Sequence, residues 1–320
     1  MRISVLALDG VFDTGISAVL DAFKLANRVA TKTSGQLVFD VTVVGVRPRV
    51  RSGLGLAIPV KPIGARSKPD WAILPALEAA LPELLMPALA RRDVQDAKAQ
   101  LAQWQAKGTK IAAACIGTFV LAEAGLLDER EATTTWWLAP LFRQRYPRVR
   151  LDESRMLVAS DAGVTAGAAM GHLDLALWLI RRTSPELAAI ASRYLLADLR
   201  SSQAPYIIPN HLVQSDALMQ RFERWAHAHL RTGFSLHDAA KALAVSARTL
   251  QRRCNEVLGK SPLDYFQDLR VERARTLIQG SDRDIDAIAA EVGYVDGATL
   301  RSLLRQRLGR GVRELRADLR

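Results

Sequence analysis

AAKALAVSARTLQRRCNEVLGKSP, residues 239–262, is the stretch that decides the fold, because AAEVGYVDGATLRSLLRQRLGRGV, residues 289–312, repeats it. At a constant offset of fifty positions and without a gap, seven of the 24 aligned positions are identical, namely Ala239/Ala289, Ala240/Ala290, Val245/Val295, Thr249/Thr299, Leu250/Leu300, Leu258/Leu308 and Gly259/Gly309. Such internal repeats indicate duplicated structural units. Each copy predicts a short helix, a tight turn and a second helix, which is the pattern of a helix-turn-helix.

The second helix of each copy has recognisable ends. Ser246 and Asp296 occupy the same place in the repeat, and their side-chain oxygens suit the N–H groups that open a helix. Gly259 and Gly309 predict the helix stops. Between these ends, apolar residues recur at i, i+4 and i+8 and predict one buried stripe per helix, formed by Leu250, Cys254 and Leu258 and by Leu300, Leu304 and Leu308.

The opposite face of each second helix is polar and rich in arginine. Arg, Gln and Asn are the side chains that pair with base edges in the major groove, and additional arginines hold phosphates. The alternative interpretation, solvated charges on an ordinary all-α domain, is weakened by the second copy with its matched cap. The predicted DNA contacts are Ser246, Ala247, Arg248, Gln251, Arg252 and Asn255 in copy one, and Gly297, Ala298, Arg301, Ser302 and Arg305 in copy two.

Residues 211–320 resemble the DNA-binding domain of the AraC/XylS transcription regulators. The matching segments are SARTLQRRCNEVLGKSPLDYFQDLRVERARTLI (246–278) and DIDAIAAEVGYVDGATLRSLLRQRLG (284–309). The resemblance implies two helix-turn-helix units joined by one long helix, here 263–279, and double-stranded promoter DNA as the partner. Copy two departs from the family pattern at Leu300, where an aromatic residue is usual, and at Gly311-Val312, where Ser-Pro is usual.

Length and charge agree with a two-part DNA-binding chain. A chain of 320 residues exceeds the usual single-domain size, and its net charge is +11. Residues 211–320 hold 19 Lys and Arg against 14 Asp and Glu, and almost all of these cations are arginine. A basic balance alone suits any polyanion, including a membrane surface, so it supports DNA only together with the motif.

The sequence also predicts the compartment. The N-terminal MRISVLALDG lacks the unbroken apolar core of a signal peptide, and no stretch approaches the roughly 20 apolar residues of a membrane span. The two cysteines, Cys115 and Cys254, fall in different predicted domains, which excludes a disulfide framework. We therefore expect a cytoplasmic protein with no membrane partner.

Short apolar runs alternate with helical spacing before residue 195. This alternation predicts a flavodoxin-like, doubly wound α/β sheet, to be followed by the all-α double helix-turn-helix domain. We expect a first domain at 1–195, a linker at 196–211 and the DNA-binding domain at 212–320, opened by a helix at 212–230. The predicted strands are 3–8, 37–46, 71–75, 110–115, 148–151 and 156–165, with helices at 15–30, 91–107, 117–125 and 167–182.

AAACIGTFVLAEAGLLDEREATTTWW (112–137) carries the strongest chemical signal of the first domain. A strand runs directly into a helix with Cys115 at the junction. A cysteine on such an elbow stands above the sheet edge, and the helix N-terminus lowers the pKa of its thiol. The segment therefore has the geometry of a nucleophile.

This segment resembles the ThiJ/PfpI branch of the class I glutamine amidotransferase-like proteins, and its fusion to an AraC-type domain resembles the GlxA-like regulators. In the enzymes of this superfamily a histidine after the elbow is the base, and Thr135 stands in its place here. Threonine cannot accept a proton at neutral pH, and His172 lies in a helix where a lone histidine is more often packed. We therefore expect no enzyme, with a Cys-dependent glyoxalase-like, amidase-like or protease-like activity as the alternative.

A small-molecule site is expected where the parallel strands end. Pro75-Ala76 replaces the usual Pro-Gly-Gly, which implies a reduced anion-binding corner, and Cys115 is either a ligand contact or simply a small residue that fits the elbow. The expected effector is a small molecule such as a nitrogen metabolite, with no cofactor and no metal, acting on a homodimer. The predicted ligand contacts are Asp13, Ala76, Cys115, Ile116 and Thr135.

Overall fold

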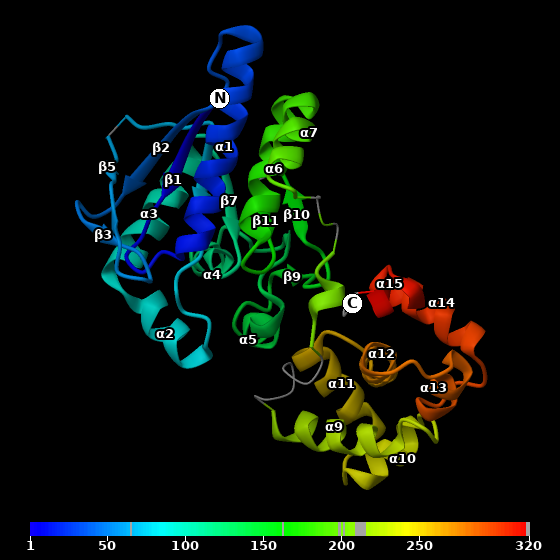
Figure 1. Ribbon diagram of the computed structural model, residues 1–320. Coiled ribbons are helices and arrows are strands. Elements are labelled where there is room, and N and C mark those ends of the chain that lie inside the picture. The colour runs from blue at the N-terminus through cyan, green and yellow to red at the C-terminus, as the bar shows by residue number, and fades with distance from the viewer. Residues whose placement is uncertain (65, 162, 198–199, 201, 209–215, 318–320) are drawn as a thin grey trace. The chain divides into compact units, whose positions relative to one another are not determined.

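A computed structural model describes residues 1–64, 66–161, 163–197, 200, 202–208 and 216–317 (Figure 1). The chain forms two units, one of residues 1–138 and 145–203 and one of residues 139–144 and 204–320. The predicted domain bounds stay a prediction, because residues 198–199, 201 and 209–215 of the linker and the following helix start lie outside the described residues.

The first unit is built on a seven-stranded sheet in the order β10-β11-β7-β6-β1-β2-β5. All neighbouring strands are parallel except the β10–β11 pair. The central strands are continuous apolar runs, as expected for parallel strands covered on both faces. Their bounds are β1 Arg2–Leu6, β2 Asp40–Gly45, β5 Lys61–Pro62, β6 Trp71–Leu74, β7 Lys110–Ala114, β10 Leu157–Ser160 and β11 Gly163–Ala166.

Helices cover the sheet in two groups. One group is α1 (Asp13–Ser34), α6 (Gly171–Thr183) and α7 (Pro185–Tyr194), which pack on one another and lie side by side in Figure 1. The other is α2 (Pro82–Ala90), α3 (Arg92–Ala106) and α4 (Gly117–Glu123). The smaller elements of this unit are β3 Val50–Arg51 with β4 Ala57–Ile58, β8 Glu131–Ala132 with β9 Arg150–Leu151, and a 3₁₀ turn at Trp136–Leu138. Helix α5, Ala139–Arg145, follows this turn, and its residues 139–144 belong to the second unit.

The predicted α/β class is confirmed, and the errors are local. Residues 156–165 are not one strand but the antiparallel pair β10 and β11. The helix predicted at 167–182 begins at Gly171, because Ala168 has a φ of 47° and breaks the helical path. Helices α2 and α7 were not predicted; each begins at a proline, which is common at the first position of a helix.

The second unit is all-helical in its regular structure over 217–317. Two short-helix, turn, second-helix units are joined by α12, Pro262–Gly280, close to the predicted 263–279. The remaining bounds are a 3₁₀ turn at Ala204–Tyr206, α9 Ala217–His229, α10 Leu236–Ala242, α11 Ala247–Leu258, α13 Ile285–Glu291, α14 Gly297–Leu308 and α15 Val312–Ala317. None of the described helices is long and apolar enough to cross a membrane.

The constant fifty-residue offset is wrong for the first helix of the repeat. The N-caps of α10 and α13 are Ser235 and Asp284, which are 49 positions apart, whereas α11 and α14 are 50 apart. The turn of copy two is therefore one residue longer. The left-handed residue of each turn shifts accordingly, from Ala244 at φ 55° to Gly293 at φ 83°.

Candidate functional site

The second helices α11 and α14 begin and end as the sequence predicted. Ser246 Oγ accepts a hydrogen bond from the Thr249 N–H at 3.0 Å, and Asp296 Oδ1 accepts one from the Thr299 N–H at 2.7 Å. The Thr299 N–H lowers the pKa of the Asp296 carboxyl. At the other ends Gly259 and Gly309 are left-handed, with φ 64° and 67°. Both caps satisfy N–H and C=O groups that the helix itself cannot.

Each second helix has one buried and one exposed face. The predicted apolar stripe is buried in both copies. On the other face, Arg248, Arg252 and Asn255 are exposed, as are Ala298, Arg301, Ser302 and Arg305, while Ala247 and Gln251 are half-buried. The structure thus places the predicted polar residues of each copy together on the outer side of its second helix.

Gly297 differs from the other predicted DNA contacts because it is buried. Its N–H donates to Asp286 Oδ1 at 2.6 Å, and an added Cβ would lie 2.8 Å from the same oxygen. The close approach of α14 to α13 therefore explains why glycine stands here.

The exposed arginines differ in their ion pairing. Arg252 binds Glu256 at 2.9 Å, one turn along α11. Within the described residues, no ion pair involves Arg248, Arg301 or Arg305. These three guanidinium groups are the cations of the two faces that are available to a phosphate or a base edge.

Cys115 lies at the strand–helix elbow as predicted, but its thiol is not activated. Its φ is 53°, and its N–H donates to the Ala166 carbonyl at 2.8 Å. Burial raises the pKa of the thiol to about 12, and the negative charge of Glu78 also raises it. Hydrogen bonds from the Ile116 N–H and the Thr135 hydroxyl lower this pKa, but their effect is smaller than that of burial. The expected lowering by the helix N-terminus is therefore wrong, because desolvation of the thiolate is the larger effect.

His172 is held as a neutral residue of the core. Its Nε2 accepts from the Ala76 N–H at 3.0 Å, and its Nδ1 lies 2.6 Å from the Ala169 carbonyl, which fixes the proton on Nδ1. Burial lowers its pKa to about 4. An added Cβ at Gly15 would lie 2.7 Å from the ring. The Ala76 N–H therefore donates to the His172 ring and is not available to donate to an anionic ligand.

The predicted ligand contacts lie in segments that follow the strands, and most of them are buried. Ala76, Cys115, Ile116 and Thr135 are buried, and Asp13 is half-buried, with its carboxylate accepting from the Leu54 N–H at 3.0 Å. Sequence reasoning missed Glu78, the charge that acts on Cys115, since no pattern distinguishes it from other exposed glutamates.

Gln203 is a second residue near this site that no motif indicated. It is 1% exposed, and its Nε2 donates to the Thr134 carbonyl at 2.9 Å and to Thr133 Oγ1 at 3.1 Å. Thr134 in turn donates from Oγ1 to the Cys115 carbonyl at 2.7 Å. Hydrogen bonds therefore connect the elbow to a residue that the sequence had placed in the linker.

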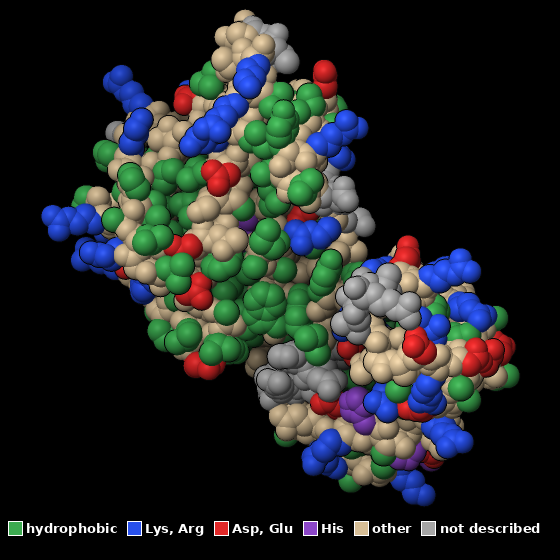
Figure 2. Space-filling view, viewed as in Figure 1, with side chains coloured by type: hydrophobic (Ala, Val, Ile, Leu, Met, Phe, Trp, Pro, Cys, Tyr) green, Lys and Arg blue, Asp and Glu red, His purple; other side chains and the backbone are tan. Residues whose placement is uncertain are grey.

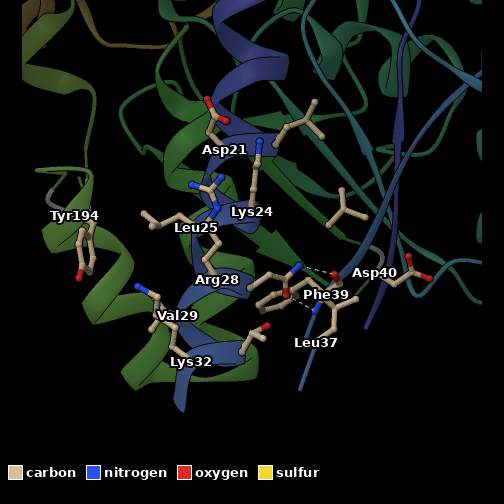
Figure 3. Close-up of a pocket in the computed structure, with 14 residues that line it drawn as sticks. Asp21, Lys24, Leu25, Arg28, Val29, Lys32, Leu37, Phe39, Asp40 and Tyr194 are labelled. Atoms are coloured by element: carbon tan, nitrogen blue, oxygen red, sulfur yellow. Dashed lines mark hydrogen bonds between the residues drawn. The ribbon is translucent and has the colours of Figure 1, made fainter. Parts of the chain in front are cut away.

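An open groove of about 1280 Å³ runs along the outer side of α1. Lys24, Arg28 and Lys32 project from successive turns of this helix, opposite Leu37 and Phe39 (Figure 3). Figure 2 shows a row of basic side chains over the same helix. None of the five predicted ligand contacts lines this groove.

Comparison with known proteins supports each half of this description. A family model described as a helix-turn-helix domain matches residues 239–318. The regulator GbdR of Pseudomonas aeruginosa is 28% identical over 193 residues, which are 59% of this chain and 52% of GbdR. ArgR of the same organism is 29% identical over 69% of this chain and 68% of its own, and GlxA of Rhizobium meliloti is 30% identical over 58% and 59%.

Solved structures match the fold of the first unit. A structure described as an AraC family transcriptional regulator from Pseudomonas putida has a TM-score of 0.51 at 19% identity, covering 61% of this chain and 98% of that chain. A ThiJ/PfpI family protein from Pseudomonas syringae has a TM-score of 0.50 at 20% identity, covering 76% and 90%. At these identities the likeness shows the fold alone.

The chain is a helix-turn-helix protein with an α/β N-terminal domain. Residues 239–318 match the helix-turn-helix model, the N-terminal unit has the fold of the ThiJ/PfpI family protein from Pseudomonas syringae, and the chain is similar to the regulators GbdR and GlxA. The match to GbdR spans about half the length of that protein.

Proposed function

We propose that this chain is a sequence-specific transcription regulator that binds promoter DNA in the cytoplasm through α11 and α14. The observation that carries the proposal is the pair of capped helices, each of which presents on its exposed face arginine that forms no ion pair with any residue the structure describes. An α-helix fits the major groove, and recognition helices about one helical turn apart on DNA can enter successive grooves.

The N-terminal domain is proposed to be a non-catalytic sensor of a small molecule, with nitrogen metabolites as the first class to try, and a dimerisation domain. A ligand that favours one dimer arrangement would shift the spacing of the DNA-binding domains. A thermal-shift screen of the full chain against amino acids, amines and quaternary ammonium compounds tests the sensor role, because a bound ligand raises the apparent unfolding temperature.

The DNA assignment is tested with Arg248, Arg252 and Arg301 replaced together by alanine. The probe is a duplex that the wild-type chain selects from a random-sequence pool, titrated at fixed salt. We expect Kd to rise at least tenfold, since each base-pairing arginine contributes about 1–3 kcal/mol. A matched variant replaces three exposed, ion-paired arginines of the first unit, Arg2, Arg148 and Arg155, with the same change in net charge.

Two results would contradict the DNA assignment. Equal weakening by both triple variants would assign binding to net charge alone, and no weakening by either would leave α11 and α14 without a role. Failure of the wild-type chain to select any sequence, with no footprint of defined length, would indicate nonspecific coating of DNA.

The absence of catalysis is tested at Cys115. A thiol whose pKa is raised to about 12 is almost wholly protonated at pH 7, so we expect slow labelling by a mild electrophile that accelerates only in strongly alkaline solution. Mass spectrometry of the labelled peptide across pH measures this. Labelling that is complete at pH 7, with an inflection below the ordinary cysteine pKa of about 8.5, would restore the enzyme alternative.

A further inference from the structure

Arg270 is a charged residue in the interior of the second unit. It lies in the middle of α12 and is 6% exposed. Its Nε and Nη2 both donate to the Leu230 carbonyl, at 3.0 and 2.8 Å. The guanidinium carbon lies 4.8 Å from the ring centre of Phe266 and 5.0 Å from that of Tyr294. No acidic side chain pairs with it among the described residues, so one carbonyl and two rings compensate the buried charge.

These contacts join the two helix-turn-helix units. Leu230 follows α9, and α9 is fixed to copy one, where Asp216 binds Arg253 of α11 at 2.7 Å and Met219 contacts Cys254. Tyr294 belongs to the turn of copy two, and its hydroxyl donates to Gln267 of α12. Arg270 therefore touches the end of copy one's supporting helix and the turn of copy two at once.

Gly293 shows how closely the turn of copy two approaches this point. It is left-handed, at φ 83°. An added Cβ would lie 2.2 Å from the Leu230 carbonyl oxygen and 2.3 Å from Arg270 Nη2. The glycine, the guanidinium and the end of α9 thus meet without space between them, and any shift of one displaces the others.

We infer that Arg270 is a positioning residue for DNA binding, which holds α14 at a fixed place relative to α11 so that both helices engage one DNA duplex together. The inference rests on the proposed function. Two linked contacts reinforce each other only when their geometry allows simultaneous engagement. Arginine suits the position because its planar fork donates twice to one oxygen while its faces meet the rings, which a lysine ammonium cannot do.

The first test is a comparison of single and double variants in the full chain, with the selected duplex as probe. In the wild-type background we expect both Arg248→Ala and Arg301→Ala to weaken binding at least fivefold. In the Arg270→Lys background, Arg248→Ala should keep its effect, whereas the effect of Arg301→Ala should fall below about twofold, because α14 no longer engages together with α11.

The matched control is Arg273→Lys, three residues further along α12, where the side chain pairs with Glu291 at 2.9 Å on the surface. We expect it to leave both effects unchanged. Tyr294→Leu is a second variant, which removes one ring while the Leu230 hydrogen bonds remain; it should reproduce the Arg270→Lys pattern if Arg270→Lys itself fails to fold. Equal retention of both arginine effects in these variants would overturn the inference.

A distance measurement separates this inference from the proposed function. Spin labels at Asn255→Cys in α11 and Gln306→Cys in α14 report the separation of the two helices without DNA, since the native Cys115 and Cys254 are buried. We expect a narrow distance distribution in the wild-type background and a broad or displaced one with Arg270→Lys. Identical distributions would overturn the positioning role, whatever the DNA titration shows.

Discussion

The two helix-turn-helix units share their helix lengths, caps and buried stripes, but their turns are constructed differently. In copy one the left-handed residue is Ala244, which is exposed. In copy two it is Gly293, pressed against the Leu230 carbonyl and Arg270. A left-handed alanine costs about 1 kcal/mol and is tolerated at the surface, whereas the second turn has no room for a Cβ. The duplicated pattern therefore determines the fold within each helix-turn-helix unit. The turn at Gly293 determines how copy two packs against the end of α9 and against α12.

The largest expected difference between the copies is at these turns. Gly293→Ala should destabilise α13 and α14 by about 2–4 kcal/mol, because the new Cβ overlaps backbone and adopts a left-handed conformation. The matched Ala244→Gly should change the stability of α10 and α11 by less than about 1 kcal/mol. Amide hydrogen exchange of the four helices measures both, and similar protection losses in the two variants would contradict the distinction.

The caps should differ in their response to pH. Ser246→Ala should destabilise copy one by about 1 kcal/mol at any pH, since its hydroxyl does not titrate. Asp296 has a folded pKa below the ordinary 3.8, so its contribution is present above that value and is lost as the pH falls through the lowered one. Hydrogen exchange of Asp296→Asn should therefore differ from wild type at pH 7 and approach it as the pH falls below 3.8; a constant difference would show that the charge has no role.

The smallest expected effect concerns ion pairing on the two polar faces. Glu256 neutralises Arg252 in copy one, and the arginines of the predicted face in copy two have no such partner in the part of the chain that is described. Glu256→Gln should tighten DNA binding about two- to fivefold and steepen its salt dependence, because Arg252 becomes available to phosphate. Titration at several salt concentrations measures this, with Glu272→Gln on α12 as the control; equal changes in both variants would indicate a general charge effect.

The helix ends and the α/β class could be predicted because they depend on local chemistry. Ser246, Asp296, Gly259 and Gly309 act on groups within one turn of themselves, so sequence spacing suffices. Apolar runs such as 110–114 identify buried parallel strands for the same reason. The buried and exposed faces of α11 and α14 could be predicted from the spacing of their apolar residues at i, i+4 and i+8.

The strand-end site could not be predicted in its electrostatics. The helix N-terminus next to Cys115 is visible in the sequence, but the degree of burial that raises the thiol pKa depends on packing from distant segments. The bond between His172 and the Ala76 N–H joins residues 96 positions apart, and no local pattern indicates it. The extra residue of the second turn was hidden because Ala239 and Ala240 in the first helix of copy one match Ala289 and Ala290 in an ungapped alignment.

That extra residue shows how a duplicated module can diverge in length. Val295 stands at the tip of the longer turn with 98% of its surface exposed, immediately before the Asp296 cap. The insertion therefore falls where no core contact has to be remade, while the helices on either side keep their lengths and caps. The turn before α14 is therefore a position at which the length of one helix-turn-helix unit can be changed by design without altering the other unit.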